Sequence, residues 1–363
     1  MTALVPRPGI LDIAAYVGGE HQGDIRLASN EGALGPSPKA IEALRRHADT
    51  MHRYPDGGSA ELRRALGRRF NLDAERIVCG SGSDELLSLL VRAYAGPGDE
   101  VLYSQHGFLM YPISAKTVGA TPVAAPETNL RTDVDAMLAS VTERTKVVFV
   151  ANPNNPTGSY LTAAELARLH AGLPENVLLV IDAAYAEYVT QPDYSDGSEL
   201  AERFPNAVMT RTFSKIFALG SLRLGWAYCP AAVADVLNRL RGPFNVSGAG
   251  QAAGVAALED GEFLERSRAL NEENRKHFSE RLRALGLTVH PSVGNFVLVS
   301  FAALPAGRND AEAARLHLKA RGILVRQMGS YGLPDCLRIT IGLREQMDTV
   351  ADALADFIHE KAA

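Results

Sequence analysis

The stretch Thr210-Arg-Thr-Phe-Ser-Lys-Ile-Phe-Ala-Leu-Gly-Ser-Leu-Arg-Leu-Gly-Trp226 carries one lysine, Lys215, among residues that are mostly apolar, hydroxyl-bearing or glycine. Removing water from a lysine favours its neutral, nucleophilic amine. Neutral lysine amines form Schiff bases with carbonyl compounds, and the aldehyde of pyridoxal phosphate is one of them. A lysine at a solvated strand end would fit the same pattern. The rest of the chain therefore has to supply the groups that such a cofactor needs.

Apolar runs alternate with amphipathic segments around this stretch. The predicted strands are Arg76–Cys79, Glu100–Tyr103, Lys146–Val150, Val177–Ile181, Ala207–Thr210 and Leu224–Tyr228, and the predicted helices are Ala40–Ala48, Ser59–Phe70, Ser83–Tyr94, Leu109–Val118 and Leu161–Leu173. Ser59 is expected to be the N-cap of its helix. Strands that alternate with helices are typical of a largely parallel sheet that helices cover on both faces. We therefore predict an α/β fold.

The pattern changes from about residue 231. The predicted helices there are Ala231–Arg241, Gly261–Leu285, Ala311–Arg321 and one that begins at Glu345, and the predicted strands are Phe296–Phe301, Ile323–Arg326 and Leu337–Ile341. This order indicates a second, α+β domain. We expect an N-terminal arm of residues 1–35, a large domain of residues 36–245 and a small C-terminal domain of residues 246–363.

The composition is that of an ordinary soluble globular protein, with 363 residues of which 46% are apolar. The 37 basic and 42 acidic residues give a net charge of −5, which favours neither nucleic acid nor a membrane surface as a partner. Cys79, Cys229 and Cys336 lack the spacing of zinc ligands or disulfide pairs. The N-terminus lacks the apolar core of a signal peptide, and no apolar stretch reaches membrane-spanning length. We expect a cytoplasmic protein without a metal ion.

The segment Asn152-Pro-Asn-Asn-Pro-Thr-Gly158 follows the buried strand Lys146–Val150. Asn, Pro and Gly at this density define a stiff turn. Loops at the carboxyl ends of parallel strands are where α/β folds bind their ligands. Asn155 could donate to or accept from a ring hydroxyl of such a ligand, although a turn built only for its geometry would need the same residues.

Asp182 lies at the tip of the buried strand Val177–Ile181. A carboxylate there is costly unless it faces a partner, and a protonated pyridine nitrogen is one such partner. Tyr185, three residues later, could direct its phenol at an oxygen of the same ring. A helix N-cap or a surface turn is an equally good explanation of Asp182 alone.

Two further features would suit anions. Gly80-Ser-Gly-Ser-Asp-Glu85 joins a strand to a helix, where free backbone N–H groups meet the positive helix end, although a plain helix cap would look the same. Arg338, on the apolar strand Leu337–Ile341, and Arg326, at the end of Ile323–Arg326, are suited to carboxylates or phosphates. Salt bridges to acidic neighbours are the alternative for both.

Lys215, Asp182, Tyr185, the Asn152–Gly158 segment and Arg338 occur in one chain, and this combination resembles the fold-type-I pyridoxal-phosphate aminotransferases. Within that class, the chain is most similar to the histidinol-phosphate aminotransferase subfamily. The segments that carry the resemblance are Leu27–Glu31, Leu34–Pro38, Arg53–Asp56, Asn152–Gly158, Thr212–Lys215, Leu222–Gly225 and Cys336–Gly342. It implies a large domain with a mostly parallel seven-stranded sheet between helices, and a smaller α+β domain.

The resemblance also implies a role for each site residue. Lys215 would form the Schiff base and move the proton of the substrate α-carbon, with Asp182 on the pyridinium nitrogen. The other cofactor contacts would be Asn155 and Tyr185 at the 3-oxygen, Phe108 on the ring face, Gly82, Ser83, Thr212, Ser214 and Arg223 at the phosphate, and Tyr54 from the partner of a homodimer. The substrate contacts would be Arg338, Arg326, Asn30, Asn155 and the partner's Tyr16.

The implied activity is ping-pong transamination between histidinol phosphate and 2-oxoglutarate, which are small-molecule substrates. The chain departs from the usual family pattern at Gly32-Ala33, in the segment after Lys215, and at Gln105-His-Gly-Phe108. These departures lie near substrate-facing segments. They leave three alternatives open, namely an aromatic amino acid aminotransferase, a threonine-phosphate decarboxylase and an inactive cofactor-binding regulator.

Overall fold

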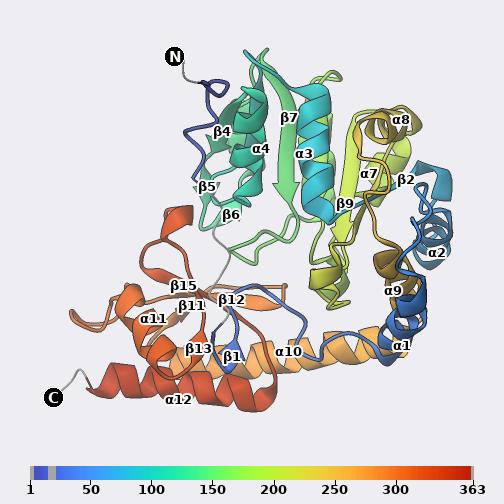
Figure 1. Ribbon diagram of the computed structural model, residues 1–363. Coiled ribbons are helices and arrows are strands. Elements are labelled where there is room, and N and C mark those ends of the chain that lie inside the picture. Colours follow the sequence, from blue (N-terminus) through green and yellow to red (C-terminus); the bar gives the residue numbers. More distant parts are fainter. Residues whose placement is uncertain (1–3, 15–21, 361–363) are drawn as a thin grey trace.

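The computed structural model describes residues 4–14 and 22–360, and its architecture is α/β, as predicted. A seven-stranded sheet with helices on both faces forms the upper part of the molecule in Figure 1, and a four-stranded sheet with long helices forms the lower part. No helix in the described ranges is both long and apolar enough to cross a membrane.

The large sheet is mostly parallel. In spatial order its strands are β2 (Ile77–Gly80), β10 (Gly225–Tyr228), β9 (Ala207–Thr212), β8 (Leu178–Asp182), β7 (Thr145–Ala151), β3 (Glu100–Ser104) and β4 (Thr121–Ala125). Only β10 runs antiparallel to its neighbours, β2 and β9. The expected mostly parallel, seven-stranded sheet is thereby confirmed, including β4, which the sequence pattern did not predict.

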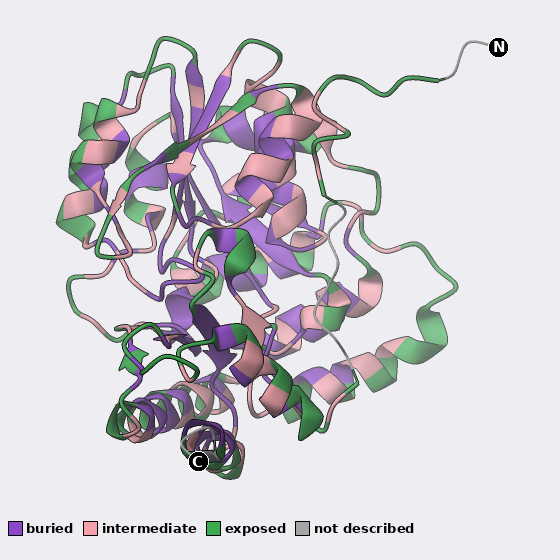
Figure 2. Cartoon of the chain, turned by 90° about the vertical axis from the view of Figure 1, so that its left-hand side faces the viewer, coloured by how far each residue is buried: buried purple, intermediate pink, exposed green. Residues whose placement is uncertain are grey.

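Alternate residues of the central strand β7 face opposite sides of the sheet, as strand geometry requires. Val147 and Phe149 pack with the helices of one face, whereas Val148 and Val150 pack with those of the other. The first face is covered by α3 (Ser83–Tyr94), α4 (Met110–Val118) and α8 (Ala231–Leu240), and the second by α5 (Val134–Ala139), α6 (Ala163–Gly172) and α7 (Ser198–Arg203). The sheet is therefore buried on both sides (Figure 2).

The second sheet is antiparallel, in the order β11 (Thr288–Val289), β12 (Phe296–Ser300), β15 (Cys336–Thr340) and β14 (Arg326–Gln327). It packs with α10 (Gly261–Ala284), α11 (Ala311–Ala320) and α12 (Arg344–Glu360). The prediction of one strand over Ile323–Arg326 is wrong, because β13 (Ile323–Leu324) pairs instead with β1 (Ile25–Arg26). The N-terminal arm therefore adds a strand to the C-terminal part.

A group of three helices, α1 (Pro38–His47), α2 (Ala60–Phe70) and α9 (Gly248–Leu258), lies beside the large sheet (Figure 1). Ser59 is the N-cap residue of α2, as predicted, but its side chain makes no capping hydrogen bond. Asp56 caps this helix instead, since its Oδ2 accepts from the Ala60 N–H at 2.7 Å. A short hairpin of β5 (Glu127–Thr128) and β6 (Arg131–Thr132) completes the fold.

Candidate active site

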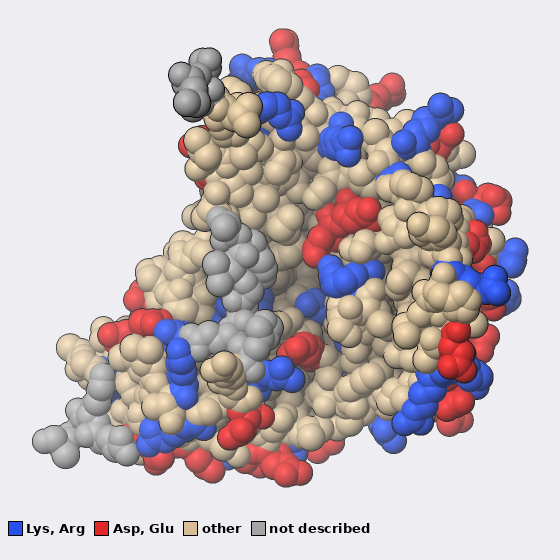
Figure 3. Space-filling model, viewed as in Figure 1, with Lys and Arg blue, Asp and Glu red and all other residues tan. Residues whose placement is uncertain are grey.

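A cavity of about 190 Å³ lies where the carboxyl ends of β7 and β8 face the second sheet. The surface in Figure 3 is hollowed between the upper and lower parts of the molecule, and acidic and basic side chains gather beside the hollow. The predicted site residues that line the cavity are Asn30, Ser83, Phe108, Asn155, Asp182, Tyr185, Thr212, Ser214, Lys215, Arg223, Arg326 and Arg338.

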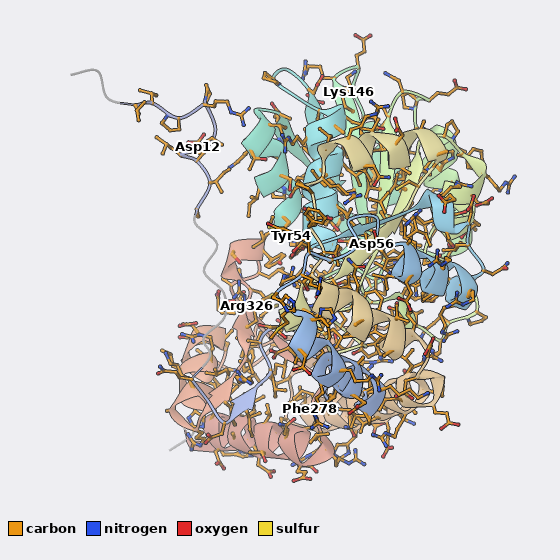
Figure 4. The ribbon with its side chains drawn as sticks, turned by 45° about the vertical axis from the view of Figure 1, so that its right-hand side comes forward. Asp12, Tyr54, Asp56, Lys146, Phe278 and Arg326 are labelled. Atoms are coloured by element: carbon orange, nitrogen blue, oxygen red, sulfur yellow. The ribbon has the colours of Figure 1, made fainter. Side chains whose placement is uncertain are left out.

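Three predicted site residues are placed differently. Gly82 is the N-cap residue of α3 and is next to the lining residue Ser83. Tyr54 is 84% exposed, outside the cavity lining, and its ring stacks on Phe244 at 4.7 Å. Tyr16 lies outside the described residues. Figure 4 labels Tyr54 near the N-terminal helices, and Arg326 where the upper and lower parts meet.

Lys215 follows β9 by three residues and is only partly buried. Its Nζ donates to the backbone oxygen of Ser29 at 3.1 Å and lies 5.7 Å from the centre of the Tyr185 ring. Phe213 and Ile216 beside it are buried and hold this part of the backbone in the core. The amine therefore projects into the cavity from a fixed segment.

Asp182 ends β8 and is 5% exposed. Its Oδ2 accepts from Tyr111 Oη at 2.9 Å, and its Oδ1 accepts from Thr210 Oγ1 at 3.3 Å. Burial raises the pKa of this carboxyl to about 6. The N-cap alternative does not hold, because the next helical turn, Ala186–Tyr188, has Tyr185 at its N-cap position. The carboxyl is thus positioned for a cationic partner in the cavity.

The side chains of Asn155, Tyr185 and Arg338 meet at the base of the cavity. Arg338 donates from Nη1 to Asn155 Oδ1 and from Nη2 to the backbone oxygen of Ala28, each at 2.5 Å. Asn30 Nδ2 donates to Tyr185 Oη at 2.8 Å. Burial raises the pKa of Tyr185 to about 12. Four segments of the chain therefore converge here.

Arg326 and Arg338 are direct partners in the register of the antiparallel strands β14 and β15. Directly opposite residues on such strands share one face of the sheet. Like charges in that position repel, so this face of the sheet is suited to a bound anion. Arg338 is buried and Arg326 is half-buried, so an anion that enters the cavity reaches both guanidinium groups.

The N-terminus of α3 and Arg223 lie together at another side of the cavity and are suited to an anion. Arg223 Nη2 lies 3.1 Å from Asp84 Oδ2, and Nη1 donates to Ser214 Oγ at 3.4 Å. Gly82 has φ +85°, and a Cβ atom there would lie 2.3 Å from Arg223 Nη2. The glycine thus leaves the guanidinium beside the positive end of the helix.

Sequence reasoning missed several residues of this site. Tyr111 and Thr210 hold Asp182, Asp84 pairs with Arg223, and Tyr331 lines the cavity. Tyr111 stacks on Phe149 at 4.4 Å and meets Phe108 edge-on at 5.9 Å. The one available signal was closeness in the chain, because Tyr111 follows Phe108 by three residues, with Phe108 just before α4 and Tyr111 in its first turn.

Comparisons with known proteins agree with this geometry. A family model described as aminotransferase class I and II matches residues 22–354. The chain is 70% identical to histidinol-phosphate aminotransferase of Rhodospirillum centenum and 61% identical to that of Paramagnetospirillum magneticum, over 99% of both chains in each case. Among solved structures, histidinol-phosphate aminotransferase from Sinorhizobium meliloti, in complex with pyridoxal-5'-phosphate, matches with a TM-score of 0.90, 29% identity and 99% coverage of both chains.

Proposed function

The chain belongs to the family of class I and II aminotransferases, and from this premise we propose that it is a pyridoxal-phosphate-dependent enzyme that acts on histidinol phosphate. In the proposed reaction, histidinol phosphate and 2-oxoglutarate are converted to imidazole-acetol phosphate and glutamate in histidine biosynthesis. The names and 70% and 61% identities of its relatives support the substrate. The observation that carries the proposal is that Lys215, Asp182 and Arg223 line one cavity.

The residues of the cavity fit pyridoxal phosphate. Arg223 and the N-terminus of α3, with Ser83, Thr212 and Ser214, are suited to its phosphate. Asp182 is suited to the ring nitrogen, Asn155 and Tyr185 to the 3-oxygen, and Phe108 to the ring face. Glycine lets β10 pack closely against the N-terminus of α3, since a Cβ atom at Gly225 would lie 2.2 Å from the Ser83 nitrogen.

The cofactor, when bound, supplies an electron-withdrawing ring that weakens bonds at the substrate α-carbon. Asp182 holds the ring nitrogen protonated, because a buried carboxylate and a cation stabilise each other's charge. Tyr111 and Thr210 fix the direction of that carboxylate. Lys215 holds the cofactor covalently between turnovers, and its Nζ moves the proton at the substrate α-carbon.

The far end of the cavity binds the substrates. We assign the carboxylate of glutamate to Arg338, and the phosphate of histidinol phosphate to Arg326 and Tyr16 of the partner subunit. Two amino donors use one site in turn, so ping-pong kinetics are expected. The relative from Rhodospirillum centenum aligns over 99% of its length, which supports carrying over the whole reaction.

The proposal includes a cytoplasmic homodimer. In this dimer, Tyr54 reaches the cofactor phosphate of the neighbouring subunit. Such a contact would explain why an aromatic side chain is 84% exposed in the single chain.

The proposal also includes the division into an arm of residues 1–35, a large domain of residues 36–245 and a small domain of residues 246–363. The antiparallel second sheet, which has its own hydrophobic core, supports a separate C-terminal domain, whereas α9, within residues 246–363, packs against α1 and α2 of the large domain.

Steady-state kinetics test the substrate. Histidinol phosphate, phenylalanine and tyrosine are compared as amino donors to 2-oxoglutarate, with the same holoenzyme preparation. We expect histidinol phosphate to give the highest kcat/KM, because its phosphate adds a charged contact that the aromatic amino acids lack. A higher kcat/KM for either aromatic amino acid would refute the proposed substrate and leave the cofactor assignment intact.

A further inference from the structure

A second cleft, of about 580 Å³, lies on the other side of the Asn152–Gly158 loop from the active-site cavity. Pro153 and Asn155 of this loop line the active-site cavity, whereas Thr157 and Gly158 line the cleft. The opposite wall is formed by α10 and the loop that leads into β12. Its volume lies within the range that is typical of small-molecule sites, roughly 300–1,000 Å³.

The cleft carries an excess of positive charge. Arg131 is paired with Glu165, and Arg275 is paired with Glu272, each at 2.5 Å. Lys276 and Arg283 also line the cleft. Among residues 4–14 and 22–360, no carboxylate lies within ion-pairing distance of either, and Arg283 donates only to the backbone oxygen of Val289, at 3.3 Å.

These two cations have a spacing that suits an elongated anion. Lys276 and Arg283 are seven residues apart on α10, so they lie on one side of the helix with their backbones roughly 10 Å apart. Gln191 supplies a neutral polar group on the facing wall, where Tyr160 Oη and Thr162 Oγ1 already donate to Asp193 and Glu165. We propose that the cleft is a binding site for a small organic anion that carries an anionic group, a carboxylate or a phosphate ester, at each end of the molecule.

An occupant of the cleft would also act on the active site. Gly158 in the cleft wall accepts at its oxygen from Val293 N–H at 3.0 Å, and a Cβ atom at Gly158 would lie 2.3 Å from Ser292 Oγ. The same loop carries Asn155, which accepts from Arg338. An anion held between α10 and Gly158 therefore contacts a loop that the substrate site shares.

The test is calorimetric titration of the holoenzyme with two six-carbon probes, adipate and fructose 1,6-bisphosphate. The double variant Lys276→Ala/Arg283→Ala is compared with Lys146→Ala/Arg266→Ala, which removes the same charge elsewhere. Lys146 lies at the top of the large sheet (Figure 4), and Arg266 is exposed near the start of α10. We expect Lys276→Ala/Arg283→Ala to bind the preferred probe at least about tenfold more weakly than the wild type, and the control variant to bind it as the wild type does.

The two probes distinguish the chemistry of the anionic groups. Tighter binding of adipate assigns the site to dicarboxylates, and tighter binding of fructose 1,6-bisphosphate assigns it to phosphate esters. Equal affinity in the two double variants would overturn the proposal, because the probes would then be bound elsewhere, for example at the arginines of the active site. Absence of binding at millimolar concentrations would overturn it as well.

A kinetic measurement tests the coupling between the two sites. At a saturating concentration of the preferred probe, we expect the KM for the amino donor to change by about fivefold or more in the wild type and in the Lys146→Ala/Arg266→Ala control. The change should be lost in Lys276→Ala/Arg283→Ala. An unchanged KM in the wild type would refute the coupling through the Asn152–Gly158 loop. The calorimetric result requires no turnover, so it is independent of the proposed reaction.

Discussion

Tyr111 donates a hydrogen bond to Asp182 over 2.9 Å, and both side chains are at least 95% buried. The two residues come from different elements, α4 and β8, which lie 71 positions apart in the chain. A hydrogen bond to a buried carboxylate fixes the direction in which that carboxylate presents its charge. Tyr111 is therefore a positioning residue for the group that we assign to the cofactor ring nitrogen.

Substitution Tyr111→Phe removes this hydrogen bond and retains the ring that stacks on Phe149. Because hydrogen bonds to charged groups contribute roughly 1.5–3 kcal/mol, we expect the dissociation constant of the cofactor to rise about tenfold or more. Titration of the cofactor-free protein with pyridoxal phosphate measures this dissociation constant. Tyr103→Phe is the matched control, since Tyr103 packs 6.3 Å from Tyr111. Equal effects of the two substitutions would contradict the role of Tyr111.

The buried carboxyl of Asp182 makes the stability of the cofactor-free protein depend on pH. Its pKa is about 6 in the fold, compared with 3.8 in the unfolded chain, so folding favours the protonated form. This contribution is complete below pH 4 and is lost as the pH rises through 6. We therefore expect the cofactor-free Asp182→Asn variant to be more stable than the cofactor-free wild type above pH 6, by up to about 3 kcal/mol. Near pH 4 this difference should disappear.

Urea unfolding at several pH values measures this difference in stability. Cofactor titration at pH 8 should show the opposite effect on affinity, with the variant binding the cofactor more weakly than the wild type. The substitution removes the negative charge that faces the ring nitrogen, so cofactor affinity should fall even while the cofactor-free protein gains stability. If Asp182→Asn destabilises the protein equally at pH 4 and pH 8, Asp182 has a purely structural role.

Gly82 tests the anion-binding end of the cavity. A Cβ atom there would press on the Arg223 guanidinium, so we expect Gly82→Ala to weaken cofactor binding by about tenfold. Gly98 is a matched control, because it has a similar φ of +93° and a Cβ atom there would meet no atom of the described residues within 4 Å. Both substitutions should cost about 1 kcal/mol of folding stability, and Gly98→Ala should leave cofactor affinity unchanged. Similar affinities in the two variants would argue against a phosphate site at Arg223.

The two arginines of the second sheet are predicted to serve different substrates. Arg338→Ala should raise the KM for glutamate by roughly 10- to 100-fold, because it removes a charged contact to the carboxylate. Arg326→Ala should raise the KM for histidinol phosphate and have a smaller effect on glutamate. Steady-state measurements of the KM for glutamate and of the KM for histidinol phosphate in each variant separate these effects. Identical profiles for the two variants would mean that neither arginine distinguishes the substrates.

The large sheet was predictable because its strands are buried on both faces and therefore read as continuous apolar runs, such as Lys146–Val150. Lys215, Asp182 and the Asn152–Gly158 loop lie at or just beyond the ends of such strands, so their meeting in one cavity followed from parallel topology. The second sheet was less predictable. Two-residue strands such as β1 carry too little pattern to be recognised, and their pairing depends on a partner almost 300 residues away.

The helix α9 escaped prediction because Gly248–Leu258 consists mainly of glycine and alanine, which give no apolar stripe and low helix propensity at each glycine. Its helicity comes from packing against α1 and α2. Contacts between residues far apart in the chain were also missed. Thr340 Oγ1 donates to Asn30 Oδ1 across 310 positions, and such a contact leaves no local signal.

Reduction of the holoenzyme with borohydride, followed by peptide mapping, tests the central claim most directly. Because Lys215 projects into a cavity with Asp182 and Arg223, the account predicts that pyridoxal phosphate becomes fixed to the peptide that contains Lys215. It also predicts that Lys215→Ala abolishes both the labelling and transamination. Labelling of another lysine, or transamination that persists in Lys215→Ala, would contradict the account.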